Sequence, residues 1–570
     1  MKKINYLASL ILVVAVLSSC ANLNKMKQTA GNIKYEVIPE VLETHGGEVA
    51  LTIKATFPEK FFLKQAIVEA TPVLVYEGGE TAFEPITLQG EDVQENNPVI
   101  KLTGGNHSYN GKVPFKEEMK LSQLMLRGTA SMKDKSVDFD PVKLADGVIA
   151  TSTYVCKKGK PVVMGDKFKR IIPESTVADI HYVINVANVR GSELKAEDIE
   201  GLKNYIKESN EKVNYKFTGT EILAYASPDG EFDFNEKLAG KRSVTAEKFI
   251  DRELKRTKVE AAKDEGFITK TSTPEDWDGF KKLMEESQVE DKDLILRVLS
   301  MHSDPVVRER EIKNIAAAYK EIAKDILPKL RRSIIKVNID VIGFSDEEIA
   351  DCLVSNPDTL NLEEILYAAT LTEDLEKKLS IYKLATEKAP KCFRAWNNVG
   401  YTNMYMGKVS EAKEAFEKSK ELKDTDAVKT NLGYVAILEG DLDKAHEYFN
   451  SVSEPGKEVN CGLGIICIIK ADYANAVTYF GTEPTYNSAL AKLLNGDSNG
   501  AKRTLDNMEI DCGKEYYLKA IVGARVQDEA YMFDNLRSAV GKDAKLKETA
   551  KKDMEFGKYF VNDTFKSIVE

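Results

Sequence analysis

The chain is poor in the residues from which metal, redox and nucleophilic sites are most often built. Its 570 residues include seven cysteines, five histidines and two tryptophans. No two cysteines stand in a Cys-x-x-Cys pair and the histidines are scattered, so we expect neither a metal site nor a dithiol redox centre. Whether the cysteines after Cys20 form disulfides stays open, and those on helical faces are interpreted as small core residues. They are Cys156, Cys352, Cys392, Cys461, Cys467 and Cys512.

The chain also lacks a basic arm and a second long apolar run. Its formal net charge is −11, and charged residues make up 30% of the sequence. Phosphate binding needs clustered Lys and Arg, so nucleic acid is not expected as the main partner. No apolar stretch beyond the N-terminal one is long enough to cross a bilayer, Ile465–Ile469 being far too short.

The N-terminus predicts a secretory signal peptide over residues 1–19. Two lysines precede an apolar run from Leu7 to Leu17, which is shorter than the roughly 20 residues of a membrane span. The run ends in Leu17-Ser18-Ser19-Cys20, which resembles the lipobox of bacterial lipoproteins. The resemblance implies that Cys20 is lipidated and that residues 20–33 form a polar tether. The alternative is an ordinary signal peptide in which Cys20 is incidental.

The residues after Cys20 bear on which membrane holds the chain. Ala21–Lys25 contains no Asp directly after the cysteine, a feature that marks inner-membrane retention in many bacteria. It also lacks the acidic run that some groups use for export to the surface. The lipoprotein resemblance therefore implies an outer-membrane anchor with a body that faces the periplasm.

The length of the chain implies several domains. At 570 residues it exceeds the size of a single core, and roughly three or four domains are expected. Between residues 34 and 155, short β-rich runs separated by Gly-Gly turns predict an immunoglobulin-like β-sandwich. Residues 156–176 are interpreted as a linker. The β-rich runs include Tyr35–Ile38, Val49–Ile53, Ile67–Tyr76 and Val99–Leu102.

A strand, a turn and a helix are predicted in succession between Ile222 and Arg242. Pro228-Asp229-Gly230 ends the apolar strand, because proline cannot donate to a ladder and glycine takes turn geometry freely. Residues from Asn235 onward recur at three- and four-residue steps, which predicts a helix. Phe234-Asn235, Leu238 and Arg242 stand at the spacing of the peptidoglycan-binding signature, so this stretch resembles the OmpA-like family.

The resemblance to OmpA-like domains implies a ligand site. In that family, an Arg on the helix and an Asp at the end of the strand grip the diamino acid of the peptidoglycan stem. Here Arg242 would carry the ligand carboxylate, and Asn235 would orient the loop or the ligand. Ser227 occupies the acidic slot, so Asp229, two positions on, is the candidate for the anion. The alternative for Arg242 is a solvated side chain or a bridge to a neighbouring acid.

Residues 177–345 as a whole are predicted to be this OmpA-like α/β sandwich. A strand over Val177–Ala187 opens it, and the alternation of apolar and polar residues over Ile335–Val341 predicts the closing strand. A helical insertion over about residues 273–328 is predicted from the helix-start signals Thr273-Pro274 and Asp304-Pro305. The insertion is interpreted either as a partner-binding arm or as a lid over one side of the sheet.

Residues 346–570 are predicted to be an all-α solenoid of tetratricopeptide repeats. Small and aromatic residues recur at a period near 33, because small residues are needed where paired helices touch and an aromatic ring fills the gap to the next pair. Such arrays present a concave surface that binds peptides or folded proteins. The recurring residues are Gly400, Gly407, Ala412 and Phe416, then Gly433, Gly440, Ala445 and Phe449, then Gly464, Ala471, Ala476 and Phe480.

No catalytic constellation is expected. Gly496-Asp497-Ser498-Asn499-Gly500 spells the hydrolase motif Gly-x-Ser-x-Gly, but it follows a repeat helix and is interpreted as an interhelical turn. No cofactor is expected, and the chain is predicted to be a non-enzymatic lipoprotein scaffold of the outer membrane. It would recruit protein partners through the repeats and contact peptidoglycan through the OmpA-like domain, as an accessory subunit of an envelope assembly or secretion complex. The alternative is a purely protein-binding scaffold whose OmpA-like domain has lost peptidoglycan binding.

Overall fold

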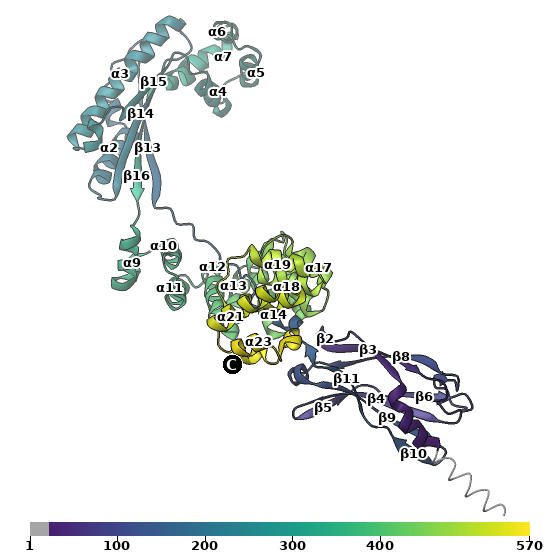
Figure 1. Cartoon of the computed structure of the whole chain (residues 1–570). Helices are drawn as coiled ribbons and strands as arrows, with labels where there is room; N and C mark the ends of the chain where they lie inside the picture. The colour runs from purple at the N-terminus through teal and green to yellow at the C-terminus, as the bar shows by residue number, and fades with distance from the viewer. Residues whose placement is uncertain (1–21) are drawn as a thin grey trace, which may run out of the picture. The chain divides into compact units, whose positions relative to one another are not determined.

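The computed structural model describes residues 22–570 (Figure 1). Contacts within the chain divide it into two compact units. The first unit combines the chain up to Gly165 with Glu373–Glu570, and the second is Asp166–Thr372. The predicted signal peptide and Cys20 lie outside the described residues. Within residues 22–570, none of the helices combines the length and the apolar character needed to span a membrane.

A β-sandwich forms the N-terminal part of the first unit. In one sheet, β3 pairs with β1, β2 and β8, and β12 adds to β2 in parallel. In the other sheet, β4 and β9 pair at the centre. The first sheet comprises β1 (Lys34–Ile38), β2 (Leu42–His45), β3 (Glu48–Phe57), β8 (Gly105–Pro114) and β12 (Val148–Ile149). The second comprises β4 (Ile67–Tyr76), β5 (Gly79–Ala82), β6 (Ile86–Gly90), β7 (Val99–Ile100), β9 (Gln123–Met132), β10 (Lys135–Asp138) and β11 (Val142–Asp146).

The segment predicted to be a polar tether is instead attached to the sandwich. Residues 22–29 are helical, and Leu23 and Met26 are each 2% exposed. Both side chains pack with Phe61 and Phe62 in an apolar cluster of the sandwich. The prediction rested on the polar residues of the segment and overlooked that Leu23 and Met26 stand three apart, on one face of a helix. Residues 22–29 therefore belong to the folded body.

The second unit is built on a four-stranded sheet in the order β13-β16-β14-β15. β16 is antiparallel to both of its neighbours, and β14 and β15 are parallel, joined by the long helix α3. The sheet comprises β13 (Ile171–His181), β14 (Tyr215–Tyr225), β15 (Ile268–Thr273) and β16 (Arg332–Ile342). The helices are α2 (Glu197–Asn210) and α3 (Phe232–Arg256), which share an apolar core with the sheet.

Two elements of this unit differ from the sequence prediction. The opening strand lies at Ile171–His181 rather than at Val177–Ala187, because the chain leaves the sheet after Tyr182 and turns at Asn185, where φ is 58°. β15 was not predicted, since its sequence Ile-Thr-Lys-Thr-Ser-Thr is polar and largely exposed, as suits an edge strand.

The insertion between β15 and β16 is a small helical cluster with its own apolar core. The first of its helices begins at Trp277, where the Asp276 carboxylate accepts a hydrogen bond from Gly279 N, and not at Pro274 as predicted. The second predicted start is confirmed, since Asp304 caps a helix whose first residue is Pro305. The helices are α4 (Trp277–Glu286), α5 (Lys292–Met301), α6 (Pro305–Asn314), α7 (Ala316–Glu321) and α8 (Leu327–Leu330), with a π-helical turn at Ile322–Ile326. Helices α9 (Asp346–Ser355) and α10 (Leu362–Ala368) follow β16.

Helices from α11 onward complete the first unit and pack in consecutive pairs. A Cβ on Gly400, Gly433 or Gly464 would come within 2.7 Å of the ring of Phe416, Phe449 or Phe480 on the next helix, so glycine permits the close approach. The helices are α11 (Leu375–Lys388), α12 (Phe393–Tyr405), α13 (Val409–Leu422), α14 (Asp426–Glu439), α15 (Leu442–Asn450), α16 (Lys457–Ile469), α17 (Tyr473–Phe480), α18 (Tyr486–Leu494), α19 (Ser498–Asp506), α20 (Gly513–Arg525), α21 (Glu529–Lys542), α22 (Leu546–Ala550) and α23 (Asp563–Val569).

Candidate functional site

The residues of the predicted ligand site come together between the end of β14 and the start of α3. They line a pocket of about 350 Å³, which also includes Ile184 and Asn185 from the loop after β13. The residues on the β14–α3 side are Ser227, Asp229, Gly230, Glu231, Phe234, Asn235, Leu238 and Arg242. The structure therefore brings together the four polar residues named from the sequence.

Arg242 is buried and is bonded to backbone. Its side chain is 1% exposed, and its guanidinium donates to the carbonyl oxygens of Val183 at 3.3 Å, Val186 at 3.1 Å and Tyr225 at 2.8 Å. The ring of Tyr182 lies 5.0 Å from its central carbon. Burial lowers the pKa of Arg242 to about 10. The side chain ties the loop after β13 to the end of β14, which is a structural role.

Asp229 is also paired within the protein. The Ser227 hydroxyl donates to one carboxylate oxygen, and Arg331 donates to the other at 3.2 Å. Arg331 also donates from Nε to the Ser227 hydroxyl at 3.2 Å. Asn235 donates to the carbonyl oxygens of Ser227 and Gly230, so it fixes the turn. Sequence reasoning missed Arg331, which only the pairing of β16 with β14 brings to this site.

A second constellation lies on the first helices of successive repeat pairs. The chain from Tyr154 to Gly165, here called the strap, runs along these helices and is held through its main chain. The Asn487 carboxamide accepts from Cys156 N at 2.9 Å and donates to Cys156 O at 2.8 Å. Asn431 makes the same two bonds with Val162, at 2.6 and 2.8 Å.

The same contact recurs at the far end of the strap. Asn398 accepts from Met164 N and donates to Met164 O, both at 2.8 Å. Asn397 adds a donation to Val162 O at 3.0 Å, and Arg394 donates to Gly165 O at 3.2 Å. We call Asn398, Asn431 and Asn487 the asparagine row. They are 1%, 0% and 7% exposed, so their amide groups form hydrogen bonds with the strap rather than with water.

The asparagine row follows the repeat. Each member stands two residues before the small residue at which the helices touch, namely Gly400, Gly433 and Ala489. The intervening pair has Gly462 at that position, where a Cβ would come within 2.2 Å of the Phe449 ring. The sequence analysis missed the row, although its periodic position was a signal that could have revealed it.

Where Gly462 breaks the asparagine row, the strap is held by packing against an aromatic ring and by an ion pair. Gly159 has φ of 61°, and a Cβ there would lie 1.9 Å from the ring of Tyr434. The Lys160 ammonium lies 3.4 Å from the Glu483 carboxylate. Only glycine fits against Tyr434 at this point, because a side chain would need both the space of the ring and a left-handed backbone.

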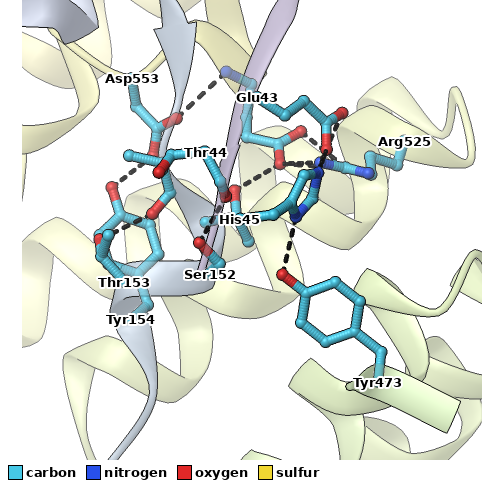
Figure 2. Close-up of polar contacts among 12 residues, drawn as sticks. Glu43, Thr44, His45, Ser152, Thr153, Tyr154, Tyr473, Arg525 and Asp553 are labelled. Atoms are coloured by element: carbon cyan, nitrogen blue, oxygen red, sulfur yellow. Dashed lines mark hydrogen bonds and ion pairs between the residues drawn. The ribbon is translucent and has the colours of Figure 1, made fainter. Parts of the chain in front are cut away.

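Side-chain contacts join the N-terminal end of the strap and strand β2 to the repeats (Figure 2). Tyr154 donates from its hydroxyl to Asp553 at 2.7 Å. His45 Nδ1 lies 2.7 Å from the Tyr473 hydroxyl, and Arg525 donates to Glu43 at 3.3 Å. The sandwich is thus bonded to the repeats both through β2 and through the strap.

The Gly-x-Ser-x-Gly motif lies at the junction between two repeat helices. The interpretation of the motif as an interhelical turn is confirmed for Gly496, where φ is 87°, and for Asp497, which caps α19 by accepting from Gly500 N at 2.7 Å. The last three residues of the motif, 498–500, instead form the first turn of α19. Across residues 22–570, no group of three or more His, Cys, Asp and Glu side chains is placed to hold a metal ion.

A tetratricopeptide repeat family model matches residues 393–426. A solved tetratricopeptide repeat protein from Parabacteroides merdae is 14% identical, with a TM-score of 0.31, and the match covers 37% of this chain and 91% of that one. PilW, a type IV pilus biogenesis factor, is 14% identical, with a TM-score of 0.26 and coverage of 35% and 92%. Yeast Tom70 is 12% identical, with a TM-score of 0.27 and coverage of 65% and 94%. No curated protein matches the chain. The family match confirms that the C-terminal helical part contains tetratricopeptide repeats.

Proposed function

We propose that the protein is a non-enzymatic scaffold of the cell envelope that recruits protein partners through its tetratricopeptide repeats. The observation that carries this proposal is the asparagine row, which holds both main-chain polar groups of Cys156, Val162 and Met164. Bonds of this kind recognise main-chain N–H and C=O groups rather than one particular side chain. Repeats equipped in this way suit the recruitment of protein segments.

The envelope location is proposed from the sequence. Cys20, at the end of its lipobox-like motif, would be lipidated and would hold the chain at the outer membrane with its body in the periplasm. Replacement of Cys20 by Ser should abolish labelling by an alkyne-bearing fatty acid fed to the producing cells. Retained labelling at another residue, or none in the wild type, would remove the lipoprotein part of the proposal.

The scaffold function is tested by cross-linking in intact cells followed by mass spectrometry. We expect cross-links from the repeat helices, Glu373–Glu570, to at least one other envelope protein, which would make the chain an accessory subunit of an assembly or secretion complex. The Cys20→Ser variant, released from the membrane, is the control for chance encounters there. If the wild type yields only cross-links within its own chain, the scaffold proposal fails.

A second candidate function is contact with peptidoglycan through the OmpA-like motif, supported by the pocket between β14 and α3. The internal bonds of Arg242 and Asp229 bear against it, because a diamino acid needs a carboxylate and a guanidinium that face the ligand. Isolated cell-wall sacculi should be incubated with wild type and with Asp229→Asn. Retention of the wild type that Asp229→Asn loses supports wall contact, whereas a wild type that is not retained supports the purely protein-binding scaffold.

A further inference from the structure

We propose that the strap is the resident ligand of the asparagine row, and that a partner reaches the row only by displacing the strap. This inference rests on the proposed scaffold function and concerns how its binding surface is controlled. The occupying segment is residues 154–165 of the same chain, which follow the sandwich in sequence and precede the second unit. The repeats are expected to bind partners, but in this structure their asparagine row binds a segment of the same chain.

The main-chain bonding shows that the strap is bound as a ligand would be. Asn398, Asn431 and Asn487 each bond the N–H and the C=O of one strap residue, and the bonded residues lie up to 331 positions away in sequence. A buried carboxamide needs partners for both its oxygen and its nitrogen, and a single extended residue supplies both. Without the strap, the three buried carboxamides would lose these main-chain partners, so another segment that offers an N–H and a C=O on one residue could take its place.

The side-chain contacts define the pattern that a competitor must match. Tyr154 reaches Asp553, Gly159 lies against the Tyr434 ring, and Lys160 faces Glu483. Val155 and Met164 pack against the apolar core of the repeats. The fitting partner is a peptide with an aromatic residue, a turn ending in a glycine five positions later, and a basic residue directly after that glycine.

The connectivity of the chain favours the strap over a free peptide. The segment is held at its start by the bond from Tyr154 to Asp553 and continues at its end into the second unit. Its binding is intramolecular, so its effective concentration is on the order of millimolar. A soluble peptide of equal intrinsic affinity is therefore largely excluded until the strap is weakened.

The test uses the full mature chain and a fluorescent synthetic peptide that corresponds to residues 153–166. Fluorescence anisotropy should show little binding to the wild type. Gly159→Val changes only the strap, so it should free the row, and we expect the peptide to bind this variant at least 10-fold more tightly. A triple variant that adds Asn431→Ala and Asn487→Ala should lose the gained affinity. The same peptide carrying valine at position 159 should fail to bind any of them.

Hydrogen exchange in the same proteins keeps the inference falsifiable if Gly159→Val disturbs folding. Amides of Val162 and Met164 should be protected in the wild type and should exchange at least 10-fold faster in Gly159→Val, while amides of helix α21 stay unchanged. A wild type that binds the peptide as tightly as Gly159→Val, or a folded Gly159→Val that keeps the protection and excludes the peptide, would overturn the inference. Because the probe is the strap itself, these outcomes are independent of whether cross-linking finds a partner.

Discussion

The carboxamide of Asn431 bonds both the N–H and the C=O of Val162, 269 residues earlier in the chain. The same nitrogen also donates to the side-chain oxygen of Asn397 at 2.9 Å. Helices α12 and α14 are thereby bonded to one another and to the strap through one buried group. The first unit is held together by a contact that resembles ligand binding.

Asn431→Ala should loosen the strap without unfolding the helices. It leaves the N–H of Val162 without its side-chain partner, whereas the C=O keeps the bond from Asn397. The loss should cost about 1–3 kcal/mol, so exchange of the Val162 amide should accelerate about 5- to 150-fold. The matched control is Asn460→Ala on α16, since Asn460 makes no side-chain hydrogen bond to the strap among the described residues. Equal exchange in the two variants would show that Asn431 does not hold the strap.

Gly433→Val should destabilise the repeats. Its Cβ would come within 2.6 Å of the Phe449 ring, and overpacking of this kind costs about 1–3 kcal/mol. Gly541→Ala on α21 is the control, because a Cβ there meets nothing within 4 Å and should add about 0.4–1 kcal/mol of stability. The protein has two tryptophans, so fluorescence of Trp396 in a Trp277→Phe background follows urea unfolding of the repeats. A Gly433→Val midpoint equal to that of the background would contradict the packing argument.

Arg242→Ala should destabilise the second unit. The substitution leaves the carbonyl oxygens of Val183, Val186 and Tyr225 without a charged donor, and we expect a loss of about 3 kcal/mol or more. In a Trp396→Phe background, Trp277 reports this unit. Lys241→Ala, at the exposed neighbouring position, should stay within about 0.5 kcal/mol. If Arg242→Ala behaves like this control, Arg242 is not structural and is available to a ligand.

The contact between β2 and the repeats should weaken in acid. Burial opposes ionisation of Glu43, but the hydrogen bond from His45 and the charge of Arg525 outweigh it and hold the pKa of Glu43 below its ordinary value. A carboxyl group with a depressed folded-state pKa adds stability above its unfolded pKa, about 4.3, and loses it as the pH falls through the folded value.

Glu43→Gln should therefore flatten the decline in stability between about pH 5 and pH 3. Trp396 fluorescence in a Trp277→Phe background, measured in urea at each pH, provides the readout. Glu36→Gln, at an exposed position on β1, should leave the slope unchanged. Parallel pH profiles for Glu43→Gln and its background would refute the expectation.

Leu23→Ala should show that the N-terminal helix belongs to the folded body. Leu23 is 2% exposed in the apolar cluster with Phe62, so truncation should cost about 2–5 kcal/mol. Exchange of the β4 and β9 amides should accelerate accordingly. Leu121→Ala is the control, since Leu121 is 49% exposed. If the two variants exchange alike, residues 22–33 act as the tether that the sequence suggested.

Local patterns explain what could be predicted from the sequence. The glycine and aromatic spacing of Gly400, Phe416, Gly433 and Phe449 identified the repeats, because packing of successive helices imposes a period. The Pro228-Asp229-Gly230 turn and the three- and four-residue steps after Asn235 placed the end of β14 and the start of α3. Each of these signals depends on residues that stand close together in the sequence.

The candidate sites were predicted only in part. The motif placed Ser227, Asp229, Asn235 and Arg242 around one pocket, but it did not indicate that Arg242 is bonded to backbone carbonyls. Arg331 stands 102 residues from Asp229 and pairs with it because β16 lies beside β14. Such a pairing leaves no periodic trace in the sequence.

By itself, the sequence determined the repeat architecture and the strand-turn-helix around Pro228, since each depends on the spacing of neighbouring residues. Tertiary structure alone decided that the asparagine row holds residues 154–165, that Asp229 is paired with Arg331, and that Leu23 is buried. The physical reason is that a buried polar or apolar group takes whichever partner the folded chain brings within reach, and that partner can stand hundreds of residues away.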